Sequence, residues 1–208
     1  MREVRVWDIA VRVGHWSLVA LFTVAYLSGE GEVETLHAWA GYAILGIVAF
    51  RILWGFVGTK HARFSDFVFG WKATAAYARS LLLLRPRHYL GHNPLGGWMV
   101  VALLVMLLLV CWSGLELYAT EGKGPLAAER TSLVTLAFAN GDEGDRGDVR
   151  EGESVWEDVH EALASFGLLL VLLHIGGVLV ASVLHRENLV RAMFTGRKRV
   201  TDRSPGNG

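Results

Sequence analysis

The sequence predicts an all-α integral membrane protein: a four-helix bundle with both chain ends in the cytoplasm and a further interfacial helix between membrane helices two and three. Two observations predict this class. The chain of 208 residues is 52% hydrophobic and contains four long apolar runs. Each run approaches the ~20 residues that a helix needs to cross a hydrocarbon core about 30 Å thick. The segments between the runs also alternate in charge, as expected for a chain that crosses a membrane repeatedly.

The four membrane helices are predicted at residues 13–28, 36–57, 98–118 and 159–184. The first run could be mistaken for a cleaved signal peptide. The segment that follows it, LSGEGEVE, is acidic and lacks a small-residue cleavage site, so we interpret the run as a retained helix. We expect residues 1–208 to form a single membrane domain.

The charges of the connecting segments predict the orientation, because lysine and arginine collect on the cytoplasmic side of membrane proteins. Residues 1–12, 58–97 and the tail 185–208 are basic, whereas the loop after the first helix has three glutamates and no base. The loop 119–157 is mostly acidic, with a group formed by Asp142, Glu143, Asp145, Asp148, Glu151 and Glu153. We therefore expect a multi-pass protein of a bacterial inner membrane whose two acidic loops face outward.

The second cytoplasmic segment contains FVFGWKATAAYARSLLLL at 67–84, in which Lys72 and Arg79 interrupt aromatic and apolar residues. This composition is typical of a helix that lies in the membrane interface. The alternative is an ordinary soluble helix packed under the bundle.

Two histidines bracket the apolar part of the fourth helix, His160 and His174. At about 100° per residue, fourteen steps come close to four full turns, so both imidazoles face the same way. With a rise of 1.5 Å per residue they lie about 21 Å apart along the helix axis. The helix therefore presents one imidazole near each membrane surface.

Two further histidines match these levels. His15 begins the first helix on the inner side, and His37 begins the second helix on the outer side. The sequence thus predicts an outer pair, His37 with His160, and an inner pair, His15 with His174, an arrangement suited to two bis-histidine haems. A single membrane histidine can also serve packing, proton relay or a helix–helix hydrogen bond. A zinc site is disfavoured because it clusters three or four ligands.

The single cysteine, Cys111, excludes an internal disulfide and a covalent haem attachment motif, so any haem would be held without covalent linkage. We interpret Cys111 as a small packing residue.

Two glycines are predicted to contact the haems. Gly41 lies one turn after His37, and Gly167 lies midway between His160 and His174 on the same face. Small residues let a flat ligand approach the backbone. Close packing of helices through small residues is the alternative.

Arg51 lies fourteen positions after His37, which places it on the same face at the inner level. A guanidinium inside a membrane helix needs an anionic partner, and a haem propionate would supply one. The alternative is that Arg51 extends to the cytoplasmic surface. His92 could contact a propionate or a quinone headgroup, although we favour helix capping for it.

Several stretches carry a resemblance to a known family: VWDIAVRVGHW, LHAWAGYAILGIVAFRILWGFVG, HARFSDFV, YLGHNPLGGWMVVALL, GPLA, WEDVHEALA and LLHIGGVLVASVLHRENLVRAMFTGRKR. In this order they resemble the bacterial di-haem cytochrome b family, of the b-561 and nickel–iron hydrogenase b-type subunit kind. The resemblance implies four membrane helices and two haem b groups. It also implies that His15, His37, His160 and His174 are the axial ligands. The outer stretch 132–153 departs from the family pattern.

We expect the protein to pass electrons between an outer-side (periplasmic) partner and the quinone pool, through iron that two histidines leave coordinatively saturated. The acidic loop suits docking to a basic periplasmic cytochrome c or a catalytic redox subunit, although it could equally be a solvated loop. One alternative is a self-sufficient oxidoreductase that passes electrons from a small reductant to quinone, and another is a haem-free transporter or scaffold. Membrane lipid is an expected partner and nucleic acid is not. Self-association of the chain stays open.

Overall fold

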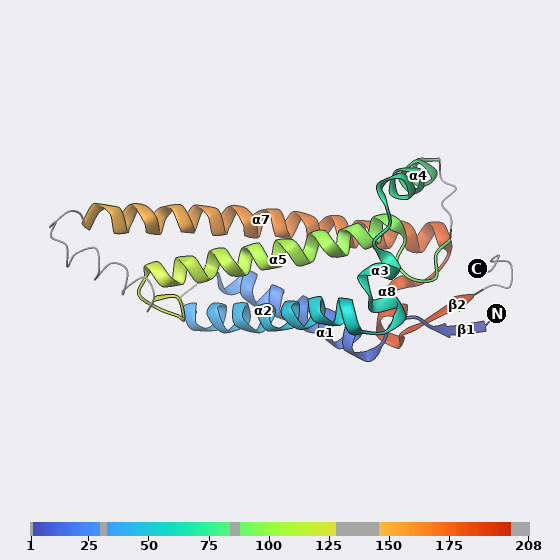
Figure 1. The fold of residues 1–208 in the computed structure, drawn as a ribbon, viewed down its shortest axis with the longest axis horizontal. Helices are drawn as coiled ribbons and strands as arrows, with labels where there is room; N and C mark the ends of the chain where they lie inside the picture. The colour runs from blue at the N-terminus through green and yellow to red at the C-terminus, as the bar shows by residue number, and fades with distance from the viewer. Residues whose placement is uncertain (1, 30–32, 84–87, 128–145, 201–208) are drawn as a thin grey trace.

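Four long helices run side by side along the long axis of the molecule (Figure 1). They are α1 (Ile9–Ser28), α2 (Glu34–Val57), α5 (Pro94–Thr120) and α7 (Arg146–His185). The computed structural model describes residues 2–29, 33–83, 88–127 and 146–200. All four helices, α7 from Val155, are long and apolar enough to cross a membrane. The chain is therefore a multi-pass membrane protein.

All four helices begin earlier than predicted, and polar caps extend two of them, α1 and α5, beyond the apolar runs. The Asp8 carboxylate accepts a hydrogen bond from the Val11 amide at the start of α1. The Asn93 side chain accepts one from the Gly96 amide, and Pro94 supplies the first residue of α5. A side-chain acceptor before the first turn and a proline inside it are the usual start signals of a helix.

Helix α7 differs most from the prediction. It begins at Arg146, thirteen residues before the expected start at 159, so the last part of the expected outer loop 119–157 is helical. The acidic residues in this part hid the helix, because hydropathy detects only the segment that lipid surrounds. The remainder of the acidic stretch, 128–145, lies outside the described residues.

The best-packed core lies between α1, α2 and α5. Ile44 and Val48 of α2 pack with Leu104 of α5, and Leu18 and Leu21 of α1 lie against them. Helix α5 also packs along α7, so that α5 separates α7 from much of α2 (Figure 1).

Short helices follow α2 at the inner end: the 3-10 turn η1 (Lys60–Ala62), α3 (Phe64–Phe67) and α4 (Trp71–Leu82). The predicted helix 67–84 is therefore shorter than expected. Its first residue, Phe67, ends α3, and residues 68–70 are not helical. This end of α3 meets the start of α5 so closely that a Cβ on Gly97 would collide with the Phe67 carbonyl. Helix α4 packs on α5 with Thr74 and Tyr77 buried and Trp71 exposed. Its place in the membrane interface stays a prediction.

A two-stranded sheet joins the chain ends, which the all-α prediction missed. Strand β1 (Arg2–Arg5) pairs antiparallel with β2 (Arg197–Val200), with Arg2 opposite Val200. The short helix α8 (Leu189–Thr195) precedes β2 and ends at Gly196, whose carbonyl accepts from the Val6 and Trp7 amides. The sheet places both termini at one end of the bundle, as four crossings require (Figure 1).

Asp8 ties these inner elements together. Besides capping α1, its carboxylate accepts hydrogen bonds from the Trp54 indole at 3.0 Å and the Thr59 hydroxyl at 2.5 Å. Burial alone would raise the pKa of Asp8, but the hydrogen bonds from Thr59, Val11 and Trp54 outweigh it and lower the pKa below its ordinary value.

We therefore predict that Asp8→Ala lowers the free energy of unfolding by about 1–3 kcal/mol, because the cap and two side-chain bonds are lost together. Asp8→Asn keeps an acceptor for the Val11 amide and should lose less. Since the folded pKa lies below the unfolded one, the carboxylate stabilises the wild type above about pH 4 and this stabilisation disappears as the pH falls through the folded pKa. Thermal unfolding in detergent, at a series of pH values between about 3 and 7, measures both effects. Equal stability of the three proteins at neutral pH would contradict the assignment.

Candidate functional site

The structure brings four histidines together as two pairs. The ring centres of His37 on α2 and His160 on α7 are 5.9 Å apart, with an interplanar angle of 81°. Those of His15 on α1 and His174 on α7 are 6.4 Å apart, with an angle of 56°. These are the partners that the depth argument predicts, one pair at each level of the bundle.

Both pairs span a space between helices. The close backbone packing of α7 is with α5, whereas the partner imidazoles come from α1 and α2. Side chains rather than backbones therefore approach each other across this side of the bundle.

Hydrogen bonds fix the tautomers of the outer pair. The Ala25 carbonyl accepts from Nδ1–H of His37 at 2.9 Å. The Ser113 hydroxyl donates its only proton to the Val110 carbonyl at 3.0 Å, so it accepts from Nδ1–H of His160, also at 3.0 Å. Each Nε2 then carries a free lone pair, as in metal-bound histidines whose other nitrogen is held by an acceptor.

The inner pair is less constrained. Nδ1 of His15 is buried and has no hydrogen-bond partner among the described residues. The ring lies edge-on to Trp16 at 5.2 Å, and Trp16 stacks on Phe194 of α8 at 4.1 Å. Aromatic packing therefore positions His15, whereas hydrogen bonds position the two imidazoles of the outer pair.

The donor set fits haem iron. Two imidazoles bonded to opposite sides of one metal, with bonds of about 2 Å, have ring centres roughly 6 Å apart, close to both observed separations. In the part of the chain that the structure describes, no three His, Cys, Asp or Glu side chains gather as a metal site. Two opposed nitrogen ligands without a third leave the equatorial positions to a macrocycle.

Arg51 lies at the inner level. One terminal nitrogen of its guanidinium is buried without a partner among the described residues, and Cζ lies 5.5 Å from the Phe64 ring and 5.8 Å from the Phe67 ring. Two aromatic rings therefore cover the guanidinium. If Arg51 extended to the cytoplasmic surface, as in the alternative, this group would lie in water. The Asp8 carboxylate acts on this half-buried cation through space, without a direct ion pair among the described residues, so an anionic ligand group at this level would stabilise it further.

The surroundings of His92 differ from those that the sequence indicated. Its ring lies 4.5 Å from Trp7 and 4.8 Å from Phe67, and its Nδ1 is buried without a described partner. Asn93 caps α5, so the favoured capping role of His92 is wrong. Burial, assisted by the positive charges of Arg51 and Lys198, lowers the pKa of His92 to about 3. A neutral imidazole thus stands in the inner site, and nothing in the local sequence indicates this burial.

The two predicted glycines have different surroundings. A Cβ on Gly41 would meet nothing within 4 Å, so open space lies beside it, and its contact with a haem stays a prediction. Gly167 of α7 is buried against α5, and a Cβ there would lie 3.4 Å from Met106 Cγ and 4.0 Å from Val110 Cγ2. Its small size serves helix packing in the structure, and its contact with a haem stays a prediction.

Two further residues lie close to the outer pair or to Gly41: Gly114 and Cys111. A Cβ on Gly114 would lie only 3.0 Å from Cε1 of His160, so this glycine gives the imidazole its place. The Cys111 thiol is a half-buried free thiol that lies 3.7 Å from the Gly41 carbonyl, consistent with a packing role.

Comparison with known proteins yields matches along most of the chain. A family model described as "Prokaryotic cytochrome b561" matches residues 6–196. A "Probable Ni/Fe-hydrogenase B-type cytochrome subunit" of Rhizobium leguminosarum bv. viciae is 25% identical, with 97% of this chain and 91% of that protein aligned. A protein of the same description from Azotobacter vinelandii is 31% identical over 58% of this chain and 61% of its own length. No solved structure matches.

The hydrogen bond from His160 to Ser113 generates a prediction. Replacing Ser113 with alanine removes the hydroxyl acceptor of Nδ1–H of His160 and leaves only the Val110 carbonyl for it. We expect the outer site to bind its haem about 10-fold more weakly, the lower end of the effect known for supports of metal-bound histidines. Haem titration of the purified variant measures this loss. Thr120→Ala is the matched control, because the Thr120 hydroxyl makes the same kind of bond on α5, to the Leu117 carbonyl three residues earlier, and bonds to neither outer histidine. Equal haem affinity in both variants would show that Ser113 does not support the site.

Proposed function

Since the chain belongs to the prokaryotic cytochrome b561 family, we propose that it carries electrons across a bacterial inner membrane through two b haems, one in each histidine pair. The family is one of b-type membrane cytochromes, which implies haem b and electron transport. The observation that carries the finer proposal is the pairing of His37 with His160 and of His15 with His174 at two levels.

In this proposal the chain binds, orients and shields the cofactor. His37 and His160 face each other with Nε2 free because Ala25 and Ser113 hold the opposite nitrogens. His15 and His174 face each other at the inner level, where Trp16 packs edge-on to His15 and stacks on Phe194. When bound, each haem supplies one-electron redox chemistry, and two histidine ligands favour electron transfer over oxygen chemistry.

Arg51 and Gly41 complete the binding site in this proposal. The buried guanidinium would pair with a propionate at the inner level, and the open space beside Gly41 would receive the edge of the outer macrocycle. His92, neutral and enclosed beside Trp7, keeps a further polar atom available at the inner level. These groups supply binding and orientation to the cofactor, and they set its electrostatic surroundings.

The end of the bundle with both termini is the cytoplasmic end in this account. The connections at that end are basic, whereas the opposite end has Glu30, Glu32 and Glu34 and the acidic stretch before α7. The rule that positive residues stay inside supports this orientation. His37 and His160 would then serve the periplasmic side, and His15 and His174 the quinone side.

The proposed partner on the outer side is a catalytic redox subunit of the nickel–iron hydrogenase type. The printed names of the relatives support this class, because they describe B-type cytochrome subunits of such enzymes. A periplasmic cytochrome c is the second candidate, favoured by the acidic residues between 142 and 153. Those residues lie outside the described part of the chain or have undescribed side chains, so their docking role stays a prediction.

Two alternative functions can be distinguished from this proposal by experiment. A self-sufficient oxidoreductase would reduce quinone with a small reductant when the purified chain is assayed alone. A haem-free transporter or scaffold would purify without haem. An electron-transfer subunit has haem but needs a catalytic partner for turnover.

Variants of the four histidines test the pairing. His37→Ala and His160→Ala should each remove the same haem, because either change leaves iron with one protein ligand. His15→Ala and His174→Ala should remove the other. Low-temperature difference spectra and redox titration of the four purified variants distinguish the two phenotypes. If His37→Ala matches His174→Ala instead, the proposed levels are wrong.

Arg51→Gln tests the inner electrostatics. A unit charge about 8 Å from the haem, at an effective dielectric of about 20, contributes about 2 kcal/mol, which corresponds to on the order of 90 mV for one electron. Screening near the membrane surface reduces this value. We expect the midpoint potential of the inner haem to fall by tens of millivolts, because the cation stabilises the reduced form, while the outer haem hardly changes.

Redox titration of Arg51→Gln in the background of each histidine variant separates the two haems. Arg63→Gln is a suitable control, since the Arg63 side chain already bonds to the Gly58 carbonyl away from the paired rings. Equal shifts at both haems, or no shift at either, would remove Arg51 from the site.

A further inference from the structure

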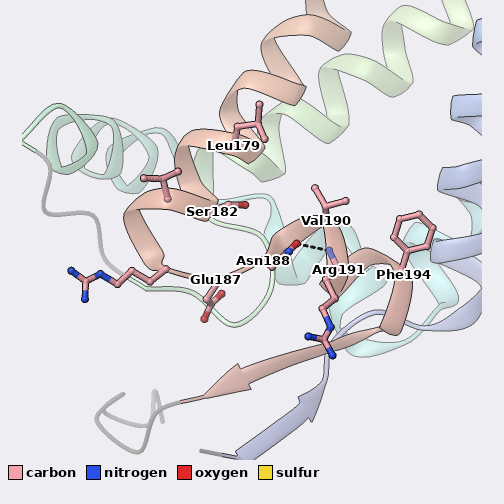
Figure 2. A pocket seen from close by; sticks show the side chains of 9 residues that line it. Leu179, Ser182, Glu187, Asn188, Val190, Arg191 and Phe194 are labelled. Atoms are coloured by element: carbon pink, nitrogen blue, oxygen red, sulfur yellow. Dashed lines mark hydrogen bonds between the residues drawn. The ribbon is translucent and has the colours of Figure 1, made fainter.

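Two adjoining pockets lie where α7 ends and α8 begins, outside the histidine site (Figure 2). The first has the apolar side chains Leu179, Val183, Val190 and Phe194 in its wall. The second is lined mostly by charged residues from β1, β2 and the α7–α8 turn. Arg186, Glu187, Asn188 and Arg191 line both pockets, so the two form one continuous surface with an apolar half and a charged half.

The apolar half belongs at membrane depth. Val183 is 75% exposed, and Leu179 and Phe194 are each 55% exposed. Val183 and Leu179 lie on the last turns of a membrane-spanning helix, so in a bilayer their exposed surface meets acyl chains rather than water. This half therefore requires an apolar occupant.

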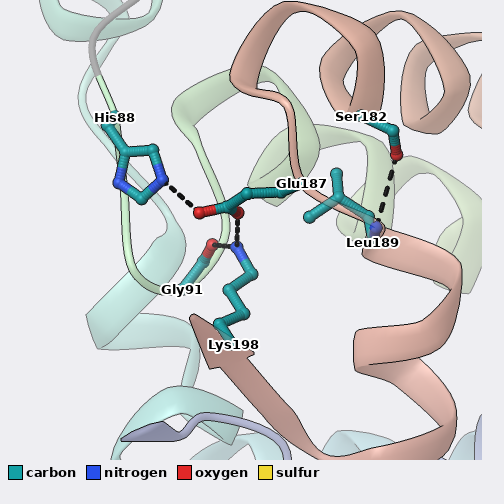
Figure 3. Close-up of polar contacts among 6 residues, drawn as sticks. All are labelled: His88, Gly91, Ser182, Glu187, Leu189 and Lys198. Atoms are coloured by element: carbon teal, nitrogen blue, oxygen red, sulfur yellow. Dashed lines mark hydrogen bonds and ion pairs between the residues drawn. The ribbon is translucent and has the colours of Figure 1, made fainter. Parts of the chain in front are cut away.

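The charged half has an excess of positive charge. Five bases line it, Arg5, Arg186, Arg191, Arg197 and Lys198, against the two acids Glu3 and Glu187. Arg197 pairs with Glu3 at 3.4 Å. Glu187 is held by His88 at 2.6 Å and by the buried Lys198 at 3.9 Å (Figure 3). Among the described residues no acid pairs with Arg5, Arg186 or Arg191, so three guanidinium groups remain for an anion.

Arg186 has an unusual backbone. Its φ of 52° is the single positive φ among the non-glycine residues that the structure describes. The position just after a helix usually holds glycine, because a Cβ is strained there. An arginine that accepts this strain at the boundary between the two pockets points to a use for its side chain.

We propose that this surface is a binding site for one anionic phospholipid of the inner leaflet. The phosphate lies among Arg186, Arg191 and Arg5, and an acyl chain follows Leu179, Val183 and Phe194 toward the membrane interior. Basic pockets beside membrane helices on the cytoplasmic face recognise such headgroups. The apolar half decides between a lipid and a free phosphate ion, since an ion would use the arginines alone.

The binding test uses the purified full-length protein with its haems bound, in nanodiscs of phosphatidylcholine to which phosphatidylglycerol is added. Native mass spectrometry measures the bound lipid. We expect preferential binding of phosphatidylglycerol, with Arg191→Gln weakening it about fivefold and the double variant with Arg186→Gln weakening it further. Arg79→Gln removes an exposed arginine of α4 and should leave the preference unchanged. No preference in the wild type, or an equal loss in Arg79→Gln, overturns the proposal.

Two further variants separate a lipid site from a structural role and from a phosphate site. Arg186→Gly should weaken lipid binding while thermal stability is retained or raised, because glycine relieves the strained φ. A parallel loss of stability and binding would make Arg186 merely structural and overturn its assignment.

Val183→Ser should weaken phosphatidylglycerol binding without altering competition by inorganic phosphate. If Val183→Ser has no effect and millimolar phosphate displaces the lipid, the site binds phosphate and the lipid proposal fails. The haem spectrum of each variant reports separately on the electron-transfer site.

Discussion

A bis-histidine haem site needs two imidazoles that face each other with free Nε2 lone pairs, and in the proposed site this requirement governs the placement of the four helices. Helix α7 supplies one imidazole at each level, and it must meet a second imidazole from α2 at one level and from α1 at the other. The helices that carry the partners therefore cannot pack against α7 as closely as ordinary neighbours do. In the proposed site, a macrocycle would lie between these helices.

The rest of the fold maintains this separation. Helix α5 packs on both α7 and α2, and its Ser113 and Gly114 orient His160 and make room for it. At the inner end, Asp8 ties the start of α1 to the end of α2. Arg12 donates to the carbonyls of Met193 and Phe194, which links α1 to the chain that follows α7. The β1–β2 pair closes the same connection, so that His15 and His174 stay opposite each other.

Much of this arrangement follows from periodicity and charge. The four spans and the levels of the histidines could be read from the sequence because helix geometry fixes where residues fourteen apart must point. The β1–β2 sheet could not, since its strands are short, charged and far apart in the chain, and each becomes a strand only through the other. The early part of α7 was hidden by its acidic residues. Gly114 was missed, and His92 was assigned to helix capping, because the surroundings of both depend on side chains from other parts of the chain.

The central claim is that each histidine pair holds one haem, and the haem content of the purified chain tests it most directly. A pyridine haemochrome assay combined with quantitative amino-acid analysis gives the number of b haems per polypeptide, and the optical spectrum of the oxidised protein gives the spin state. The account predicts two b haems per chain, both low-spin because two imidazoles bind each iron. One haem per chain, or a high-spin ferric spectrum, would contradict it.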